Sequence, residues 1–111
     1  MSDDLAWVDG VGQAELVRSG EVAAPELLEA AIARIERVNP TINAIVTPLY
    51  DKGRNEASAP DLGERPLGGV PYVLKDHLSG SAGDPMYEGM RFLRDLGWVE
   101  QADAHVVTRY R

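Results

Sequence analysis

The feature that most constrains the fold is a short apolar run, Gly68 to Asp76, which reads Gly-Gly-Val-Pro-Tyr-Val-Leu-Lys-Asp. The β-branched, aromatic and aliphatic side chains of residues 70–74 favour a buried strand, and the glycines before them and the Asp-His pair after them are typical of turns. Pro71 cannot donate a ladder hydrogen bond, so we expect it at the first position of the strand or on a sheet edge. The run predicts an α/β chain in which Lys75 stands where a strand leaves its sheet.

Lys75 is the main candidate for chemistry. Ligand sites in open α/β sheets gather at the carboxyl ends of strands. An ammonium among apolar side chains loses hydration, which makes the neutral amine, a base, more accessible near neutral pH. The alternative is a lysine that lays its stem over apolar surface and leaves its ammonium in water, which on spacing alone is the commoner case. Nine of the eleven basic residues are arginine and lysine occurs only at Lys52 and Lys75, which is in keeping with a specific use of Lys75.

Composition bounds the class of protein. A chain of 111 residues with 44% hydrophobic residues is enough for one small globular domain and argues against disorder. There is no cysteine, which excludes disulfides and thiolate metal sites, and with two histidines any metal site would have to use carboxylates. No metal-ligand spacing is present, so we expect no metal and no cofactor.

The charge pattern bears on partners and location. The formal net charge is −7, and the charges are scattered rather than blocked, which disfavours nucleic acid and anionic membrane as partners. The first residues, Met-Ser-Asp-Asp, are acidic where a signal peptide is basic, and no apolar run approaches about 18 residues. These features predict a cytoplasmic protein.

Apolar periodicity predicts five helices and a second strand. The clearest helix begins at Pro25 and ends at Asn39-Pro40, because the residue before a proline is pushed out of helical geometry. An apolar stripe on such a helix is more commonly a core face than a partner-binding face. Here the stripe consists of Leu28, Ala31, Ile32, Ile35 and Val38. The other helices are predicted over residues 6–19 with a stop at Gly20, 48–57, 86–96 with a stop at Gly97, and 102–110, and the second strand over residues 42–46.

A small, polar, Gly-rich run, Leu78 to Pro85, predicts a loop directly after the lysine. A loop in this place is where a pocket wall would be built, and the alternative is a plain flexible connector, since the run lacks the spacing of a phosphate cradle. His77 is a second candidate for catalysis, against the commoner case of a solvated loop histidine.

Four segments in order resemble the amino-terminal part of the amidase signature family, over essentially all 111 residues. They are residues 26–30 (Glu-Leu-Leu-Glu-Ala), 38–46 (Val-Asn-Pro-Thr-Ile-Asn-Ala-Ile-Val), 69–76 (Gly-Val-Pro-Tyr-Val-Leu-Lys-Asp) and the helix start at 103–109. Residues 13–20 and the strand at 69–76 are most similar to a branch that hydrolyses a cyclic amide dimer. No single segment is specific to the family. The resemblance rests on the occurrence of all four in the family's order and spacing.

The resemblance implies a fold in which helices cover a mixed central sheet, and hydrolysis of a carboxylic amide C–N bond through a Ser, cis-Ser, Lys triad. Of the triad, only the lysine has a counterpart here, Lys75. In such a triad the neutral lysine acts through the bridging serine on the nucleophile, because a serine hydroxyl is a poor nucleophile until a base takes its proton. The implied partner is a small-molecule amide, with no cofactor, and the parent enzyme is compatible with an oligomer.

Two departures from the family pattern limit the expectation. The family's Gly- and Ser-rich signature lies downstream of the lysine, and residues 1–111 end before it, so we expect an amino-terminal portion of an amidase domain with an incomplete fold and no activity of its own. Ser79 and Ser81 lie too close after Lys75 and lack the glycine pattern, so they do not replace the nucleophile. Where many members have a small motif with Thr and Gly, residues 86–90 read Met-Tyr-Glu-Gly-Met, which puts an inherited substrate preference in doubt.

Two other readings stay open at the level of sequence. The first is the amidotransferase subunit that releases ammonia from glutamine, which shares the family fold. The second is a small α/β interaction module without catalysis. A Gly-Gly-Ser-Ser-Gly-Gly-like run after Arg111 would favour the enzyme.

Overall fold

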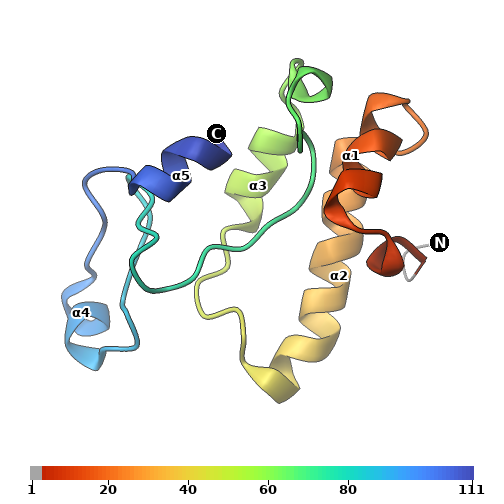
Figure 1. Cartoon of the computed structure of the whole chain (residues 1–111). Coiled ribbons are helices and arrows are strands. Elements are labelled where there is room, and N and C mark those ends of the chain that lie inside the picture. Colours follow the sequence, from red (N-terminus) through yellow and green to blue (C-terminus); the bar gives the residue numbers. More distant parts are fainter. Residues whose placement is uncertain (1–3) are drawn as a thin grey trace. The chain divides into compact units, whose positions relative to one another are not determined.

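The structure is a computed structural model that describes residues 4–111 (Figure 1). The chain divides into two compact units, Met1–Tyr72 and Val73–Arg111. In chain order the elements are a 3₁₀ helix at Asp4–Trp7, α1 at Gly10–Arg18, α2 at Ala24–Ile42, α3 at Tyr50–Ala57, a second 3₁₀ helix at Leu62–Glu64, α4 at Arg91–Leu96 and α5 at His105–Tyr110. Among the described residues, no helix is both long enough and apolar enough to cross a membrane.

Local signals account for the ends of the helices in the first unit. The Asp9 carboxylate accepts a hydrogen bond from the Gly12 N–H at 2.8 Å and so caps the start of α1. The predicted stop at Gly20 is confirmed, since Gly20 has a positive φ of 76° directly after the C-cap of α1. Pro25 lies in the first turn of α2, as predicted, because its missing N–H has no helical partner there.

The core of the first unit lies on one side of α2. Leu27 is 0% exposed, although the predicted stripe did not include it, and Ile32 from that stripe is also buried. A Cβ built on Gly53 of α3 would lie 3.4 Å from Leu28 Cδ2, so the small residue lets α3 approach α2 closely. The Arg54 guanidinium of α3 also binds the Glu29 carboxylate of α2 through two hydrogen bonds, of 2.6 and 3.1 Å. Apolar packing and a bidentate ion pair thus join these helices.

Gly69 is required where the chain crosses α1 and α2. Its φ is 82°, and an added Cβ would lie 2.9 Å from the Ala24 Cβ and 3.0 Å from a Val17 methyl carbon. A larger residue would be strained by its backbone and would press on both helices. The glycine before the predicted strand therefore serves close packing inside the first unit.

The predicted mixed central sheet is wrong for residues 4–111. In that range the structure has no β-strand, and the only bridge is the single antiparallel pair Pro85 and Val99. Residues 70–74, predicted as a buried strand, are irregular, and Val73 is 68% exposed. A strand needs a neighbour to satisfy its N–H and C=O groups, and no described segment pairs with this run. The fold seen is helical, with the irregular connections drawn in Figure 1.

The predicted strand at residues 42–46 and the predicted end of α2 are also wrong. Helix α2 passes through Pro40 and ends at Ile42, where Asn43 adopts a left-handed conformation with φ 48°. Pro40 has no N–H to donate to the carbonyl four residues before it, and the helix continues for only two residues beyond it. The Asn39 side chain donates to the Ile45 carbonyl at 2.9 Å and accepts from the Ile45 N–H at 2.8 Å. This amide satisfies both backbone groups of Ile45, as a neighbouring strand would otherwise do.

Backbone hydrogen bonds in the second unit join residues 83–84 to Glu100. The Gly83 N–H donates to the Glu100 carbonyl at 2.9 Å, and the Glu100 N–H donates to the Asp84 carbonyl at 3.0 Å. Helix α4 ends at Gly97 in a left-handed conformation with φ 63°, which confirms the predicted stop. Val107 of α5 is fully buried and Met86 nearly so, which gives this unit a small apolar centre.

Candidate functional site

Lys75 lies in the second unit, in the irregular segment that precedes a turn at residues 76–78. Its side chain is exposed, and no described residue forms a hydrogen bond or ion pair with it. The strand that was expected to deliver it is absent from residues 4–111, so the expected placement at a strand end is corrected. Hydrogen bonds near Lys75 involve the residues that follow it along the backbone, beginning with Asp76.

Asp76 joins this backbone to a second turn. Its Oδ1 accepts a hydrogen bond from the Tyr87 N–H at 2.8 Å, and its Oδ2 accepts a longer one from the Gly89 N–H at 3.4 Å. The Asp76 carboxylate thus ties the loop that follows it to the backbone of residues 87–89. Its carboxylate is directed at backbone donors across the loop and forms no ion pair with Lys75.

Glu88 makes the converse connection, which the sequence did not predict. Its Oε1 lies 3.5 Å from the Leu78 N–H nitrogen and 3.6 Å from His77 Nδ1. His77 is exposed, and its contact with this carboxylate is an ion pair only when the imidazole is protonated. The structure places His77 beside Glu88 and does not bring it together with a nucleophile. The backbone of Glu88 has a positive φ of 51°, which is uncommon for a residue other than glycine. No sequence pattern predicts this conformation or the contact that it allows.

The predicted loop at residues 78–85 is confirmed as non-helical and is anchored rather than loose. Ser81 is 5% exposed, and its Oγ accepts a hydrogen bond from Arg111 Nη2 at 2.7 Å. Arg111 Nη1 donates to Asp103 Oδ2 at 2.9 Å, and the other oxygen of that carboxylate accepts from the Ala82 N–H at 2.8 Å. Ser81 therefore belongs to a hydrogen-bonded cluster that ties the loop to α5.

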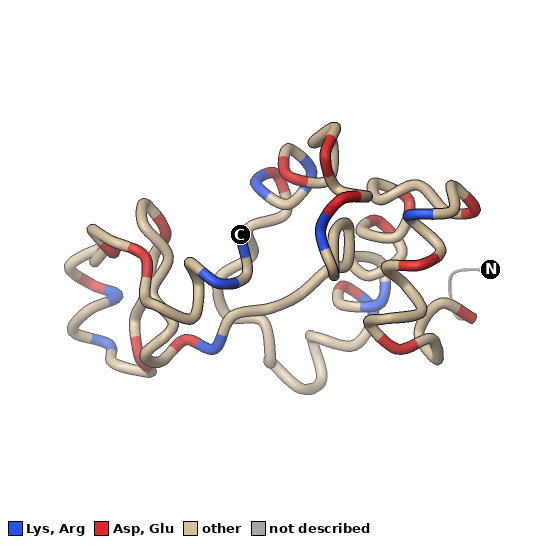
Figure 2. Tube along the Cα trace, turned by 45° about the horizontal axis from the view of Figure 1, so that its top comes forward, with Lys and Arg blue, Asp and Glu red and all other residues tan. Residues whose placement is uncertain are grey.

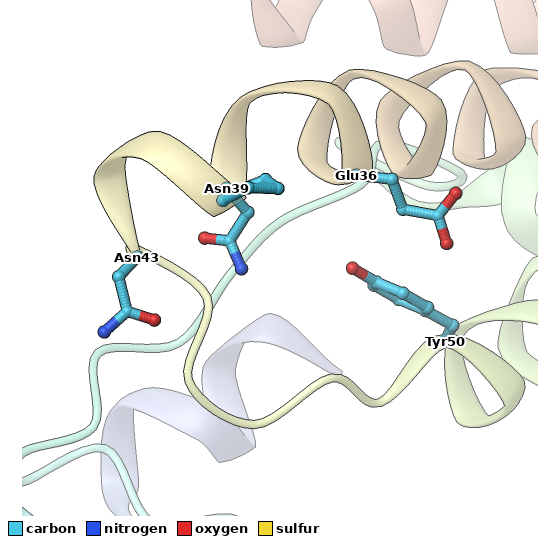
Figure 3. Close-up of a pocket in the computed structure, with 5 residues that line it drawn as sticks. Glu36, Asn39, Asn43 and Tyr50 are labelled. Atoms are coloured by element: carbon cyan, nitrogen blue, oxygen red, sulfur yellow. The ribbon is translucent and has the colours of Figure 1, made fainter.

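A separate hollow, of about 430 Å³, opens in the first unit between α2 and α3. Figure 3 shows the side chains of Glu36, Asn39 and Asn43 from α2 and its C-cap, and of Tyr50 from the start of α3, around it. The Asn39 amide is already bonded to Ile45. The remaining lining groups comprise one carboxylate, one amide and one phenol, without a base or nucleophile arranged against another group. This open hollow has no catalytic arrangement of its own.

Electrostatics in the described residues follow surface ion pairs. Hydrogen bonds from Arg54 lower the pKa of Glu29, and hydrogen bonds from Arg65 lower the pKa of Asp61. Acidic and basic residues are interspersed along the chain trace, as Figure 2 shows, which agrees with the scattered charge of the sequence. No group of three His, Cys, Asp or Glu side chains within residues 4–111 is arranged to hold a metal ion.

Comparison with known proteins identifies relatives along the whole chain. The sequence model of the Amidase family matches residues 26–111. The 6-aminohexanoate-cyclic-dimer hydrolases of Pseudomonas sp. (strain NK87) and Paenarthrobacter ureafaciens are each 45% identical over 111 residues, which is 100% of this chain and 22% of either relative. The chain thus spans about a fifth of the length of these relatives.

Solved structures show the same relationship. The structure of 6-aminohexanoate cyclic dimer hydrolase complexed with substrate is similar at a TM-score of 0.84 and 44% identity, over 96% of this chain and 21% of that chain. A second structure of that hydrolase has a TM-score of 0.83 at 43% identity, over 93% of this chain and 21% of that one. The similarity to this branch, read from residues 13–20 and 69–76, is confirmed. The chain belongs to the Amidase family.

Proposed function

We propose that this chain is the part of an amide hydrolase that supplies its base, and that Lys75 is that base. The observation that carries the proposal is the 45% identity to 6-aminohexanoate-cyclic-dimer hydrolases over all 111 residues, a range that includes the Gly-Val-Pro-Tyr-Val-Leu-Lys-Asp run. The proposed substrate is a small carboxylic amide. The first compound to test is the 6-aminohexanoate cyclic dimer, after which these relatives are named.

The proposed reaction uses the neutral Lys75 amine together with two serines from the downstream part of an amidase polypeptide. The amine takes a proton from the bridging serine, which takes one from the nucleophilic serine as its Oγ attacks the amide carbonyl carbon. The C–N bond then breaks, the proton passes to the departing nitrogen, and an acyl ester remains on the serine. Water hydrolyses this ester by the reverse proton route and regenerates the hydroxyl.

Lys75 is exposed in the described chain, so the apolar surroundings expected from the sequence would have to come from the downstream part of the polypeptide. A base must reach the proton that it abstracts, so it has to lie at a surface that the rest of the site can cover. No described carboxylate pairs with Lys75, and an ion pair there would stabilise the ammonium, which cannot act as a base. The other lysine, Lys52, lies on α3 in the first unit and provides a matched comparison.

The test uses the full-length polypeptide that contains this segment, with the 6-aminohexanoate cyclic dimer as substrate. We expect Lys75→Ala and Lys75→Arg each to lower kcat by about 10²- to 10⁴-fold, the usual contribution of a positioned base. Arginine keeps the charge but does not release its proton at working pH. Lys52→Ala should retain full turnover. Near wild-type turnover by Lys75→Ala would exclude Lys75 from the mechanism.

A further inference from the structure

The backbone that follows Lys75 is tied to a distant turn by two carboxylates that act in opposite directions. Asp76 accepts from the N–H groups of Tyr87 and Gly89, at 2.8 and 3.4 Å. Glu88, between those two residues, reaches back to the Leu78 N–H at 3.5 Å. We call Asp76, Glu88 and the backbone groups that they bind the carboxylate clasp.

The turn within the clasp is strained and needs outside support. The Met90 N–H donates to the Tyr87 carbonyl at 2.8 Å, which closes a four-residue turn. Both central residues have positive φ, 51° for Glu88 and 71° for Gly89. Glycine adopts this conformation freely, but a non-glycine residue at such a φ costs of the order of 1 kcal/mol or more. The Asp76 carboxylate holds the turn in this geometry by accepting the N–H groups on both sides of Glu88.

The clasp also fixes the direction of its two carboxylates. Asp76 is adjacent to Lys75 in the chain, yet its oxygens bind the turn. The Glu88 carboxylate lies 3.6 Å from His77 Nδ1. Charged hydrogen bonds to backbone donors hold a side chain in one direction more firmly than neutral ones. Lys75 is therefore followed at once by an anchored residue and is left without a carboxylate partner in the described chain.

We propose that Asp76 is a positioning residue for Lys75: by anchoring the chain immediately after the lysine to the turn at residues 87–90, it fixes the direction in which the amine is presented. The inference rests on the proposed function of Lys75 as the base. It assigns no chemistry to Asp76 itself, which acts only through Lys75. The rate should depend on this anchor because a displacement of about 1 Å of a catalytic group can cost about 10²-fold.

The test compares two changes at Asp76 in the full-length polypeptide with the 6-aminohexanoate cyclic dimer as substrate. Asp76→Ala removes both acceptors, and we expect kcat to fall about 100-fold while KM changes less than about threefold. Asp76→Asn keeps one carbonyl oxygen for the Tyr87 N–H, so most of the loss should be recovered, to within about tenfold of wild type. Asp95→Asn is the control, since Asp95 is an exposed carboxylate of α4 that pairs with its neighbour Arg94.

Hydrogen exchange distinguishes positioning from a general loss of folding. The amides of Tyr87 and Gly89 should exchange faster in Asp76→Ala, while the amides of α5 keep their wild-type protection. Wild-type kcat in Asp76→Ala would overturn the inference, and so would a loss of kcat in proportion to the unfolded fraction. If Asp76→Ala does not fold, Asp76→Asn decides, because it removes the acceptor of the Gly89 N–H: faster Gly89 exchange with a several-fold lower kcat supports the inference, and faster Gly89 exchange with wild-type kcat overturns it. Turnover by Lys75→Ala would instead refute the proposed function, and the exchange data would still show whether the clasp forms.

Discussion

The surface of the second unit leads to a prediction about this chain when residues 1–111 are produced alone. Four large apolar side chains of that unit are mostly in water: Leu78 is 73% exposed, Phe92 70%, Val73 68% and Leu96 62%. Full burial of such a side chain contributes about 1.5–3 kcal/mol, so covering these exposed parts is worth about 4–8 kcal/mol for each copy of the chain. We therefore expect the isolated chain to associate with itself.

The expected strength of association follows from the opposing cost. Two copies that cover these side chains gain about twice the value for one copy, against about 4–15 kcal/mol for lost translational, rotational and side-chain freedom. With a cost at the lower end of that range, about 4–8 kcal/mol, the surplus is about 4–8 kcal/mol, which corresponds to dissociation constants between about 1 mM and 1 μM. Because the side chains lie on several segments of the unit, we expect a mixture of oligomers rather than one defined dimer.

Sedimentation velocity between about 1 and 100 μM, the range in which exposed apolar surface drives association, tests this expectation. Phe92 and Leu96 are four residues apart on α4 and share a face, so Phe92→Gln combined with Leu96→Gln should shift the distribution towards monomer. Arg91→Gln combined with Asp95→Asn changes polar residues of the same helix and should leave the distribution unchanged. A monomer at the highest concentration with one sharp melting transition would refute the reasoning and favour an independent module.

Three further predictions concern contacts within each unit, measured in the full-length polypeptide. Asp103→Ala removes the acceptor of the Ala82 N–H and should speed hydrogen exchange at that amide by roughly 10- to 100-fold, as expected for loss of a charged hydrogen bond worth about 1.5–3 kcal/mol, whereas Asp103→Asn should keep most of the protection. An NMR titration should place the pKa of Glu29 below its ordinary range, and Arg54→Gln should return it; this pair stabilises the fold above the unfolded pKa, and its contribution is lost as pH falls through the lowered one. Gly69→Ala should lower the free energy of unfolding by about 1–3 kcal/mol in denaturant titration, since its φ is positive and the added methyl meets two helices.

Relation to a family could be read from the sequence, and so could the parts of the fold that depend on local bonds. Pro25 at the start of α2 and Gly97 at the end of α4 were predicted correctly, because helical hydrogen bonds join residues four apart and their ends are marked by nearby residues. The order of four short segments was sufficient to predict the amidase relationship, which the relatives confirm. The role of Lys75 stays a prediction from that relationship.

Tertiary structure decided what the sequence could not. The runs at residues 42–46 and 70–74 have the composition of strands, but a strand forms only beside a partner, and within residues 4–111 none is present. For Ile45 the backbone partner is the Asn39 side chain, and for the turn at Glu88 it is the Asp76 carboxylate. Such contacts join residues that are distant from one another or lie outside regular elements, so no local pattern announces them. The composition of these runs therefore determined only that they were able to form strands. The folded chain determined which groups their backbone N–H and C=O groups bind.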